Sequence, residues 1–262
     1  IATLIHPNKD LKFLIIIDII IIVIFSSFLF SPIITIFVNL LNTNIYSILL
    51  EINFIKAFIN SFIISIITGI FVSFFGYILA VLLVLNYKNI YFQQILFLLS
   101  SSVIIISPII FSLGYFILLQ ELRYIIVFKF IVIILINCIF LIPFSLLILF
   151  NNLKNIYLNY KDIKSSFNLK LTDYLKILFP LMKKNFLYLF AFSTIIAFGD
   201  FTIISFFKDQ NFETLPSYLY RLISAYRFEE ASFVAAFMLF ISMIIYFVID
   251  NFNYKGKLVI KT

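Results

Sequence analysis

The stretch N-N-L-K-N-I-Y-L-N-Y-K-D-I-K-S-S-F-N-L-K-L-T-D-Y-L-K-I-L-F-P-L-M-K-K-N, residues 151–185, is the least hydrophobic part of the chain. Only two acidic residues, Asp162 and Asp173, offset its seven lysines. These are Lys154, Lys161, Lys164, Lys170, Lys176, Lys183 and Lys184. A run this long and this basic is expected outside lipid, between hydrophobic segments that lie within it.

Apolar residues recur at steps of three and four on both sides of Phe167-Asn168, which predicts two short amphipathic helices. Asparagine tolerates a left-handed turn better than most residues. Thr172 can cap the second helix and Pro180 can close it. The stretch therefore predicts a basic helix–turn–helix that docks against something on the cytosolic side.

The composition of the chain excludes a water-soluble domain. Hydrophobic residues make up 64% of the chain, charged residues 12%, and the mean hydropathy is +1.17. A net charge of +7 does not indicate nucleic-acid binding, because the lysines lie between hydrophobic runs and not on one folded face. The long runs without alternation argue against a transmembrane barrel. An all-α polytopic membrane protein is expected.

The whole chain, residues 1–262, is expected to form one six-span domain. The predicted spans are about 13–41, 58–85, 92–119, 124–150, 186–207 and 231–249. Gly69 and Gly76 allow close helix approach, and Gly199-Asp200 interrupts the fifth span. A short amphipathic or re-entrant helix is expected within the loop 208–230, after Leu215-Pro216.

Lysine and arginine placement predicts the orientation. An even number of spans puts both termini and segment 151–185 on one side. The residues on that side are Lys9, Lys12, Lys88, the seven lysines of the segment, Lys255, Lys257 and Lys261. The opposite side holds Lys56, Arg123, Lys208, Arg221 and Arg227, and Lys129 is expected to snorkel near a helix end. The segment and both termini are therefore expected in the cytosol.

The sequence contains few residues that could serve in catalysis or metal binding. A lone Cys138 and a lone His6 exclude a cysteine metal site and favour no catalytic histidine, and no nucleotide-binding motif is present. We expect no enzyme activity, no metal and no bound cofactor. Uphill transport would then need an ion gradient or a separate ATPase. Only Asp18, Lys129 and Asp200 are ionisable within the spans, few for a gradient-driven carrier.

Asp200 is the leading candidate for a residue in a translocation path. A carboxylate in the membrane is costly and often marks a pathway or a partner. Its neighbour Gly199 would let the helix bend there. The alternative is a helix-end aspartate, or one satisfied by Asn137 or a serine, and the sequence leaves both readings open.

Segment 151–185 resembles the cytosolic loop of type I ABC importer permeases, whose motif reads roughly E-A-A-x-x-x-G. Asp162 stands near the acidic position and Phe167-Asn168 replaces the usual Leu-Gly, while both alanines are absent. The resemblance implies that the segment docks on an ATPase. The residues it implies for docking are Asp162, Phe167, Asn168, Leu171, Tyr174, Leu175 and Ile177.

A second resemblance covers residues 191–236. The run A-F-S-T-I-I-A-F-G-D-F-T-I-I-S-F-F, residues 191–207, looks like the fifth span of permeases for ferric iron and thiamine. Residues 211–220, N-F-E-T-L-P-S-Y-L-Y, continue the likeness, and 221–232, R-L-I-S-A-Y-R-F-E-E-A-S, are more similar to thiamine permeases. The chain resembles the C-terminal half of such a permease over nearly its full length.

The resemblance implies a permease subunit of the bacterial inner membrane that imports thiamine or thiamine pyrophosphate. The implied partners are a cytosolic ATPase dimer that uses ATP, a periplasmic binding protein and a second permease half, fused or separate. Gly199, Asp200, Phe201 and Tyr220 are candidates for the path, by charge pairing and cation–π contact with a cationic aromatic solute. A permease for ferric iron or another small solute, an ion-coupled secondary carrier and a non-transporting scaffold are the alternatives.

Overall fold

The computed structural model describes residues 9–41, 43, 45–86, 88–122, 125–166, 171–209 and 211–258. For 9–14, 16, 160–166, 171–177 and 252–258 it describes the backbone alone. Within these residues the fold is a helical bundle, and the only β pairing is an isolated bridge between Asp209 and Phe212. The all-α prediction is confirmed.

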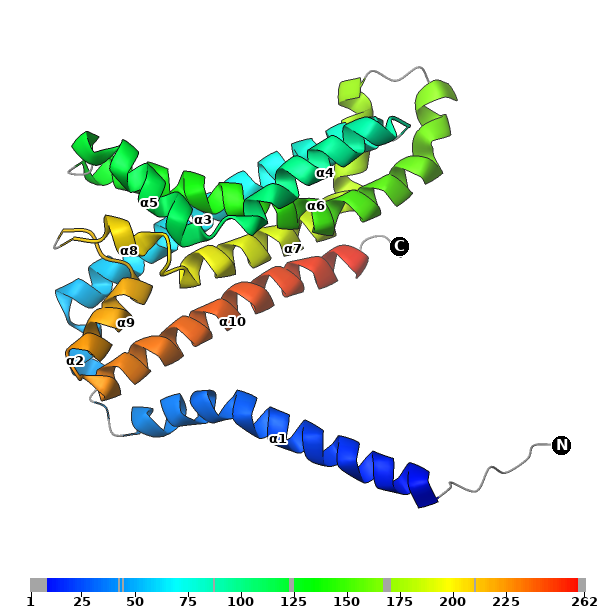
Figure 1. Cartoon of the computed structure of the whole chain (residues 1–262). Helices are drawn as coiled ribbons and strands as arrows, with labels where there is room; N and C mark the ends of the chain where they lie inside the picture. The colour runs from blue at the N-terminus through cyan, green and yellow to red at the C-terminus, as the bar shows by residue number, and fades with distance from the viewer. Residues whose placement is uncertain are drawn as a thin grey trace.

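The helices follow one another along the chain as Figure 1 shows. They are α1 (Lys9–Leu40), α2 (Ile45–Leu49), α3 (Ile52–Leu85), α4 (Ile90–Ile105), α5 (Pro108–Leu118), a 3₁₀ turn (Gln120–Leu122), α6 (Ile126–Ser166), α7 (Leu171–Gly199), α8 (Ile204–Phe207), α9 (Leu215–Ser224) and α10 (Phe228–Leu258).

Five of the described helices are long and apolar enough to cross a membrane, and α4 with α5 would make a sixth span. This pair differs from the expected continuous third span, because it bends by 86° between Ile105 and Pro108. Proline disfavours helical backbone in the residue before it and has no N–H to donate. Ser107 is accordingly extended, with ψ of 133°, and Pro108 begins α5.

Small residues occupy many of the buried positions of α3, the helix that packs against α6 and α7. Its buried positions include Ser61, Ser65, Thr68, Gly69, Ser73, Gly76 and Ala80. A Cβ added to Gly69 would lie 2.1 Å from Thr194 Oγ1 on α7, and one at Gly76 would lie 2.4 Å from Ser145 on α6. The two glycines therefore allow the close helix approach expected from the sequence.

The two short helices expected in 151–185 are the ends of two long ones. The 41-residue helix α6 continues without a break to Ser166. The prediction that Thr172 caps and Pro180 closes a separate helix was wrong, because α7 contains both residues. Leu178 and Met182, on either side of Pro180, are buried at 1% and 0% exposure, so packing outweighs the hydrogen bond that proline removes. We call the ends of α6 and α7 around residues 151–185 the elbow.

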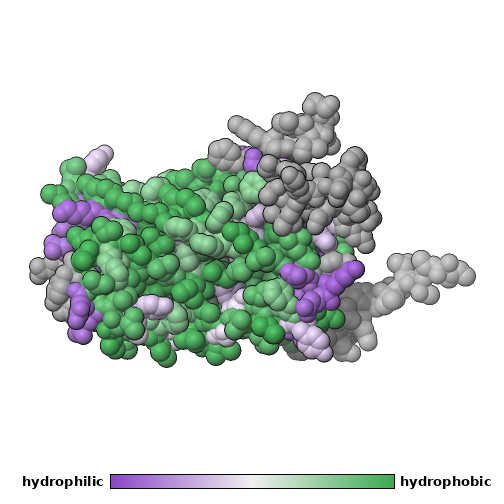
Figure 2. Space-filling view, turned by 90° about the horizontal axis from the view of Figure 1, so that it is seen from above, coloured by the Kyte–Doolittle hydropathy of each residue, from purple (hydrophilic) through white to green (hydrophobic). Residues whose placement is uncertain are grey.

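The molecule has an apolar middle and two polar ends (Figure 2). The first turn of α1, the last turn of α10 and the elbow lie at one end of the bundle, while α2, α8 and α9 lie at the other (Figure 1). This arrangement agrees with the expected topology, in which the elbow and both termini share a side. We call the end that carries α2, α8 and α9 the outer end.

Candidate functional site

Asp200 lies where α7 stops. Its Oδ1 accepts hydrogen bonds from the backbone N–H of Thr202 at 2.9 Å and of Ile203 at 3.5 Å. The carboxylate therefore caps the turn that leads into α8, as the helix-end reading anticipates. Its Oδ2 is buried with no hydrogen-bond donor among the described residues. The amide of Asn137 lies beside the carboxylate, yet the Asn137 nitrogen also lacks a described acceptor.

The loop after α8 is tied to α6 by an ion pair. Lys129, 3% exposed, is bonded to the carboxylate of Asp209 and lies 5.8 Å from the ring centroid of Phe212. The expectation that Lys129 snorkels toward water was wrong, because the loop folds back over it. Burial works to raise the pKa of Asp209, but the hydrogen bond and charge of Lys129 and the backbone N–H groups of Asn211 and Phe212 outweigh it. The pKa therefore lies below its usual range.

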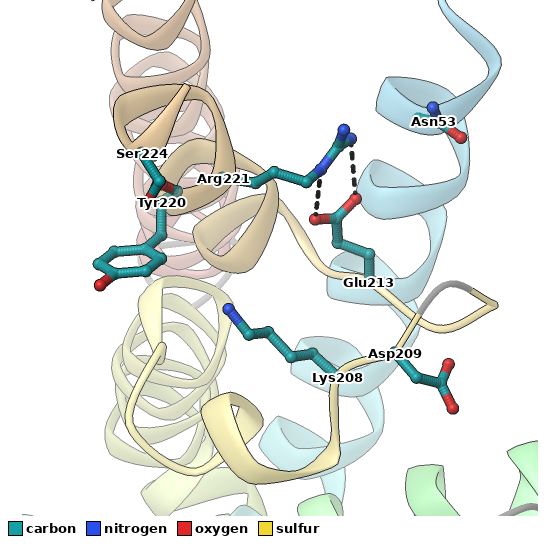
Figure 3. Close-up of a pocket in the computed structure, with 7 residues that line it drawn as sticks. All are labelled: Asn53, Lys208, Asp209, Glu213, Tyr220, Arg221 and Ser224. Atoms are coloured by element: carbon teal, nitrogen blue, oxygen red, sulfur yellow. Dashed lines mark hydrogen bonds and ion pairs between the residues drawn. The ribbon is translucent and has the colours of Figure 1, made fainter. Parts of the chain in front are cut away.

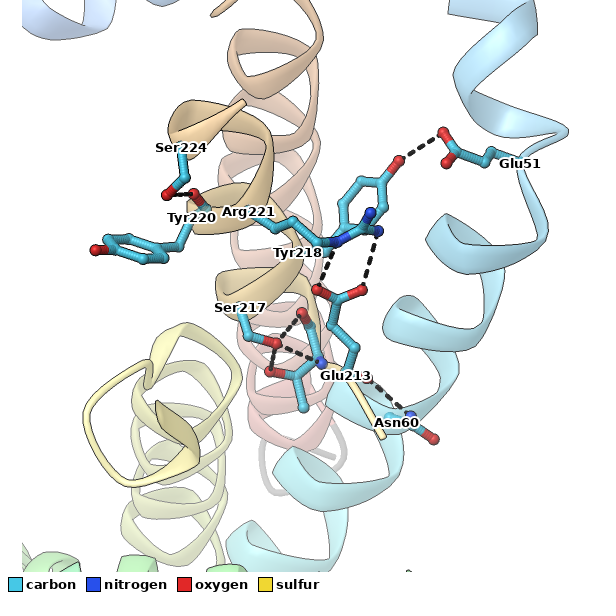
Figure 4. A network of polar contacts seen from close by, with 9 residues as sticks. Glu51, Asn60, Glu213, Ser217, Tyr218, Tyr220, Arg221 and Ser224 are labelled. Carbon is cyan, nitrogen blue, oxygen red and sulfur yellow. Dashed lines mark hydrogen bonds and ion pairs between the residues drawn. The ribbon is translucent and has the colours of Figure 1, made fainter. Parts of the chain in front are cut away.

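Helix α9 is the short helix expected in the outer loop, and buried hydrogen bonds fix its start. Thr214 and Ser217 form a capping box. The hydroxyl of Ser61 on α3 accepts the Leu215 N–H at 2.8 Å, and the Asn60 amide donates to the Glu213 carbonyl at 2.8 Å. Figure 4 shows part of this network. The loop is therefore packed on α3, where its backbone polar groups find hydrogen-bond partners within the protein.

Two further acids hold α9 to its neighbours. Glu213 accepts from Nε and Nη2 of Arg221 at 3.0 and 3.1 Å. Tyr218, fully buried, donates its hydroxyl to Glu51 at 2.7 Å (Figure 4). Burial and the bond to Glu51 raise the pKa of Tyr218, so this hydroxyl stays protonated and keeps its donor role.

A pocket of about 490 Å³ opens beside this network (Figure 3). It is lined by Asn53, Lys208, Asp209, Glu213, Tyr220, Arg221 and Ser224. The Phe201 and Tyr220 rings stack beside it with centroids 4.9 Å apart. The ammonium of Lys208 lies 5.7 Å from the Phe201 centroid and 5.0 Å from the Tyr220 centroid.

The path candidates are therefore only partly brought together. Phe201 and Tyr220 form one unit, but a cation of the chain itself already lies over their rings. Asp200 and Gly199 are not among the residues that line the pocket. From the sequence, Lys208 was only a topology signal.

The docking candidates divide between α6 and α7. Asp162 lies near the end of α6, and Leu171, Tyr174, Leu175 and Ile177 lie in the first two turns of α7. For these residues the structure describes the backbone alone. Phe167 and Asn168 fall outside the described residues, so the turn expected there stays a prediction.

Among the residues described here, no group of three His, Cys, Asp or Glu side chains could hold a metal ion. Cys138 is free and buried, and its thiol lies 4.0 Å from the Thr68 carbonyl on α3. Most of the charged side chains described at the outer end are instead paired with one another, an arrangement that positions loops.

Comparison with known proteins gives relatives of one kind. The thiamine transport system permease protein ThiP of Escherichia coli strain K12 is 28% identical over 116 residues, 44% of this chain and 22% of that protein. ThiP of Salmonella typhimurium matches to the same extent, with 28% identity over 116 residues. ThiP of Haemophilus influenzae is 26% identical over 252 residues, 94% of this chain and 46% of that protein. No protein-family model matches the chain.

The chain spans less than half the length of these curated relatives. The similarity to the Haemophilus influenzae protein nevertheless extends over nearly all of this chain. It agrees with the resemblance to thiamine permeases seen in residues 191–236. The described helices and these similarities together identify an all-helical, multi-pass membrane protein related to the ThiP permeases.

Proposed function

We propose that the chain is a permease subunit of an ATP-driven importer, that the elbow couples it to a cytosolic ATPase, and that the solute is thiamine. The names of the relatives supply the solute. An ATP-driven permease with no nucleotide-binding motif of its own needs a separate partner that hydrolyses ATP. The proposal places the elbow and both termini in the cytosol and the outer end toward a periplasmic binding protein.

The observation that carries the proposal is the continuity of α6 and α7 between the elbow and the core. At 1.5 Å per residue, the 41 residues of α6 amount to about 60 Å measured along the helix, more than the roughly 30 Å of a bilayer core, and the helix bends where it enters the elbow (Figure 1). Leu149 and Leu153 on α6 and Leu178 and Met182 on α7 are buried. A force applied to the elbow would therefore reach the packed bundle through continuous helices, without an irregular linker.

The proposed solute path passes the break after α7. Thiamine is a flat aromatic cation, and Asp200 offers an oxygen without a described partner. Gly199 has open space around its Cα, since a Cβ added there would meet nothing within 4 Å. Phe201 and Tyr220 offer aromatic faces to a cation. A cationic solute would have to displace Lys208 to use them.

Co-purification tests the coupling. The double variant Phe167→Asp, Leu175→Asp should lose its ATPase partner, because two buried charges would be forced into the docking surface. A matched control, Tyr226→Asp, changes an aromatic residue that is 83% exposed at the outer end, and should retain the ATPase. Retention of the ATPase by the elbow variant would contradict the proposal.

Uptake measurements test the solute and the energy source. Vesicles that contain the complete transporter should accumulate labelled thiamine only when ATP is inside. Accumulation driven by an ion gradient in ATP-depleted vesicles would favour the secondary carrier. Saturable uptake of ferric iron in place of thiamine would transfer the proposal to that solute.

A further inference from the structure

A groove of about 610 Å³ runs between α3 and α6 on the outside of the bundle. Ile134 and Cys138 of α6 are buried and form its floor, while Phe71 of α3 and Leu135 of α6 are exposed and form its walls. Every side chain of the lining is apolar, so the groove suits an apolar occupant. The lining residues are Ile63, Ile67, Phe71, Phe75, Val127, Phe130, Ile131, Ile134, Leu135 and Cys138.

The groove follows the helix axes over a length close to one membrane leaflet. Its lining residues extend from Ile63 to Phe75 on α3 and from Val127 to Cys138 on α6. At 1.5 Å per residue these stretches are about 18 and 16 Å long, near half of the roughly 30 Å hydrocarbon core. Both helices begin at the outer end (Figure 1). A transmembrane helix would cross the whole core, so a groove of this length fits the acyl chain of one lipid better.

A lysine lies on α3 between the groove and the outer end. Lys56 precedes Ile63 by seven residues, which is two helical turns, so the two side chains share a face of α3. Lys56 is exposed, and it takes part in none of the ion pairs among the described residues. The lysine of α6 in this region, Lys129, is buried and bonded to Asp209. Lys56 can therefore offer its charge to an anion at the membrane surface.

We propose that this groove binds one anionic phospholipid of the leaflet around the outer end, with an acyl chain along α3 and α6 and the headgroup at Lys56. Apolar contact alone would not select this lipid, because the surrounding acyl chains are as apolar as the groove. The walls and the buried floor give one chain a defined place. One basic residue near a membrane surface favours a negatively charged headgroup by about fivefold.

Tryptophan fluorescence measures the occupancy, because the chain contains no tryptophan of its own. Phe71→Trp places a single reporter in one wall of the groove, and Leu135→Trp places a second in the opposite wall. The control Phe240→Trp places one on α10, where Phe240 is 61% exposed and does not line the groove. Each full-length variant is reconstituted in phosphatidylcholine vesicles with increasing fractions of phosphatidylglycerol whose brominated chains quench tryptophan on contact. The groove reporters should favour the anionic lipid about fivefold over phosphatidylcholine, and the α10 reporter should show no preference.

Variants of Lys56 test the headgroup contact. In the Phe71→Trp background, Lys56→Gln should abolish the preference for the anionic lipid, while Lys56→Arg, which keeps the charge, should retain it. The control Lys208→Gln removes a lysine of the same end that lies over the rings of Phe201 and Tyr220. This control should leave the preference unchanged.

Three results would overturn the proposal. Groove reporters that no brominated lipid quenches would show that protein, such as a helix of a second chain, fills the groove. An equal lipid preference at the groove and at α10 would show that only bulk lipid is present. A preference that Lys56→Gln leaves unchanged would remove the headgroup contact. None of these measurements involves ATP or thiamine, so the lipid site and the proposed transport function succeed or fail separately.

Discussion

The two ends of the molecule use charge in opposite ways. At the outer end the described charges are mostly paired with one another, as in Lys129 with Asp209 and Arg221 with Glu213. In the elbow seven lysines face two acids, so most of them have no acid within the segment to pair with. One end uses charge to fix its own loops, and at the other the described lysines Lys183 and Lys184 are exposed. The difference indicates that ion pairs hold the outer loops in place, and it fits the proposal that the elbow docks on a partner.

The largest expected effect comes from breaking the ion pair that fixes the outer loop. Asp209→Asn leaves Lys129 buried without an acid, which should destabilise the protein by about 3–5 kcal/mol. Lys129→Met should cost about 1 kcal/mol or less, because the Asp209 side chain is 43% exposed and water can solvate its charge. Denaturant unfolding in mixed micelles measures both.

The double variant Lys129→Met, Asp209→Asn is the control for that pair. It should recover most of the stability lost in Asp209→Asn, since no buried charge remains. Equal losses in both single variants would mean that the buried lysine is not what makes the pair important.

The next largest effect tests whether the helices that reach the elbow are packed rigidly. Gly69→Ala places a methyl group 2.1 Å from Thr194 Oγ1, and the overlap should cost about 1–3 kcal/mol. Gly114→Ala is the matched control, because a Cβ there meets nothing within 4 Å. Thermal unfolding in detergent compares the two. Equal stability would show that α3 and α7 separate easily.

A smaller effect should appear at acid pH. The folded pKa of Asp209 lies below its usual range. The ionised carboxylate therefore contributes fully to the free energy of unfolding at pH values above the unfolded pKa, about 3.9. It is lost as the pH falls through the folded pKa. The unfolding free energy should therefore drop below about pH 4. Asp209→Asn should lack this part of the drop, and an unchanged acid profile in that variant would exclude Asp209 as its source.

The smallest effect is expected at the elbow. Lys183 and Lys184 are exposed, so replacing both with glutamine should change stability by less than about 0.5 kcal/mol. ATPase affinity in the same variant should weaken measurably if the lysines face the partner. A stability loss as large as that of Asp209→Asn would remove the contrast between the two ends.

Hydropathy predicted most of the fold because lipid requires long apolar helices whatever their packing. Proline was harder to interpret, since one proline breaks a span while another lies within a continuous helix. Pro108 begins α5 after an 86° bend, whereas Pro180 lies within α7 between buried Leu178 and Met182. The difference depends on tertiary packing, which the local sequence does not contain.

The candidate site was predictable only in part. Asp200 drew attention as a carboxylate beside a glycine, and it lies at the break between α7 and α8. The Lys129–Asp209 pair joins residues 80 positions apart, and the Tyr218–Glu51 bond joins residues 167 apart. No local pattern marks such pairs. In the sequence Lys208 was only a topology signal. Its contact with the rings of Phe201 and Tyr220 depends on how α8 and α9 pack.

The corner between α4 and α5 has a consequence for the surroundings of the protein. The 16 residues of α4 and the 11 of α5 are about 24 and 16 Å long, so neither alone crosses the roughly 30 Å of hydrocarbon. Ile106 donates its N–H to the Val103 carbonyl and Ser107 accepts from the Phe111 N–H, but other peptide groups at such a corner lack partners within either helix, and acyl chains can supply none. Water or a neighbouring polypeptide must therefore supply partners at this point, so lipid alone cannot surround the bundle there.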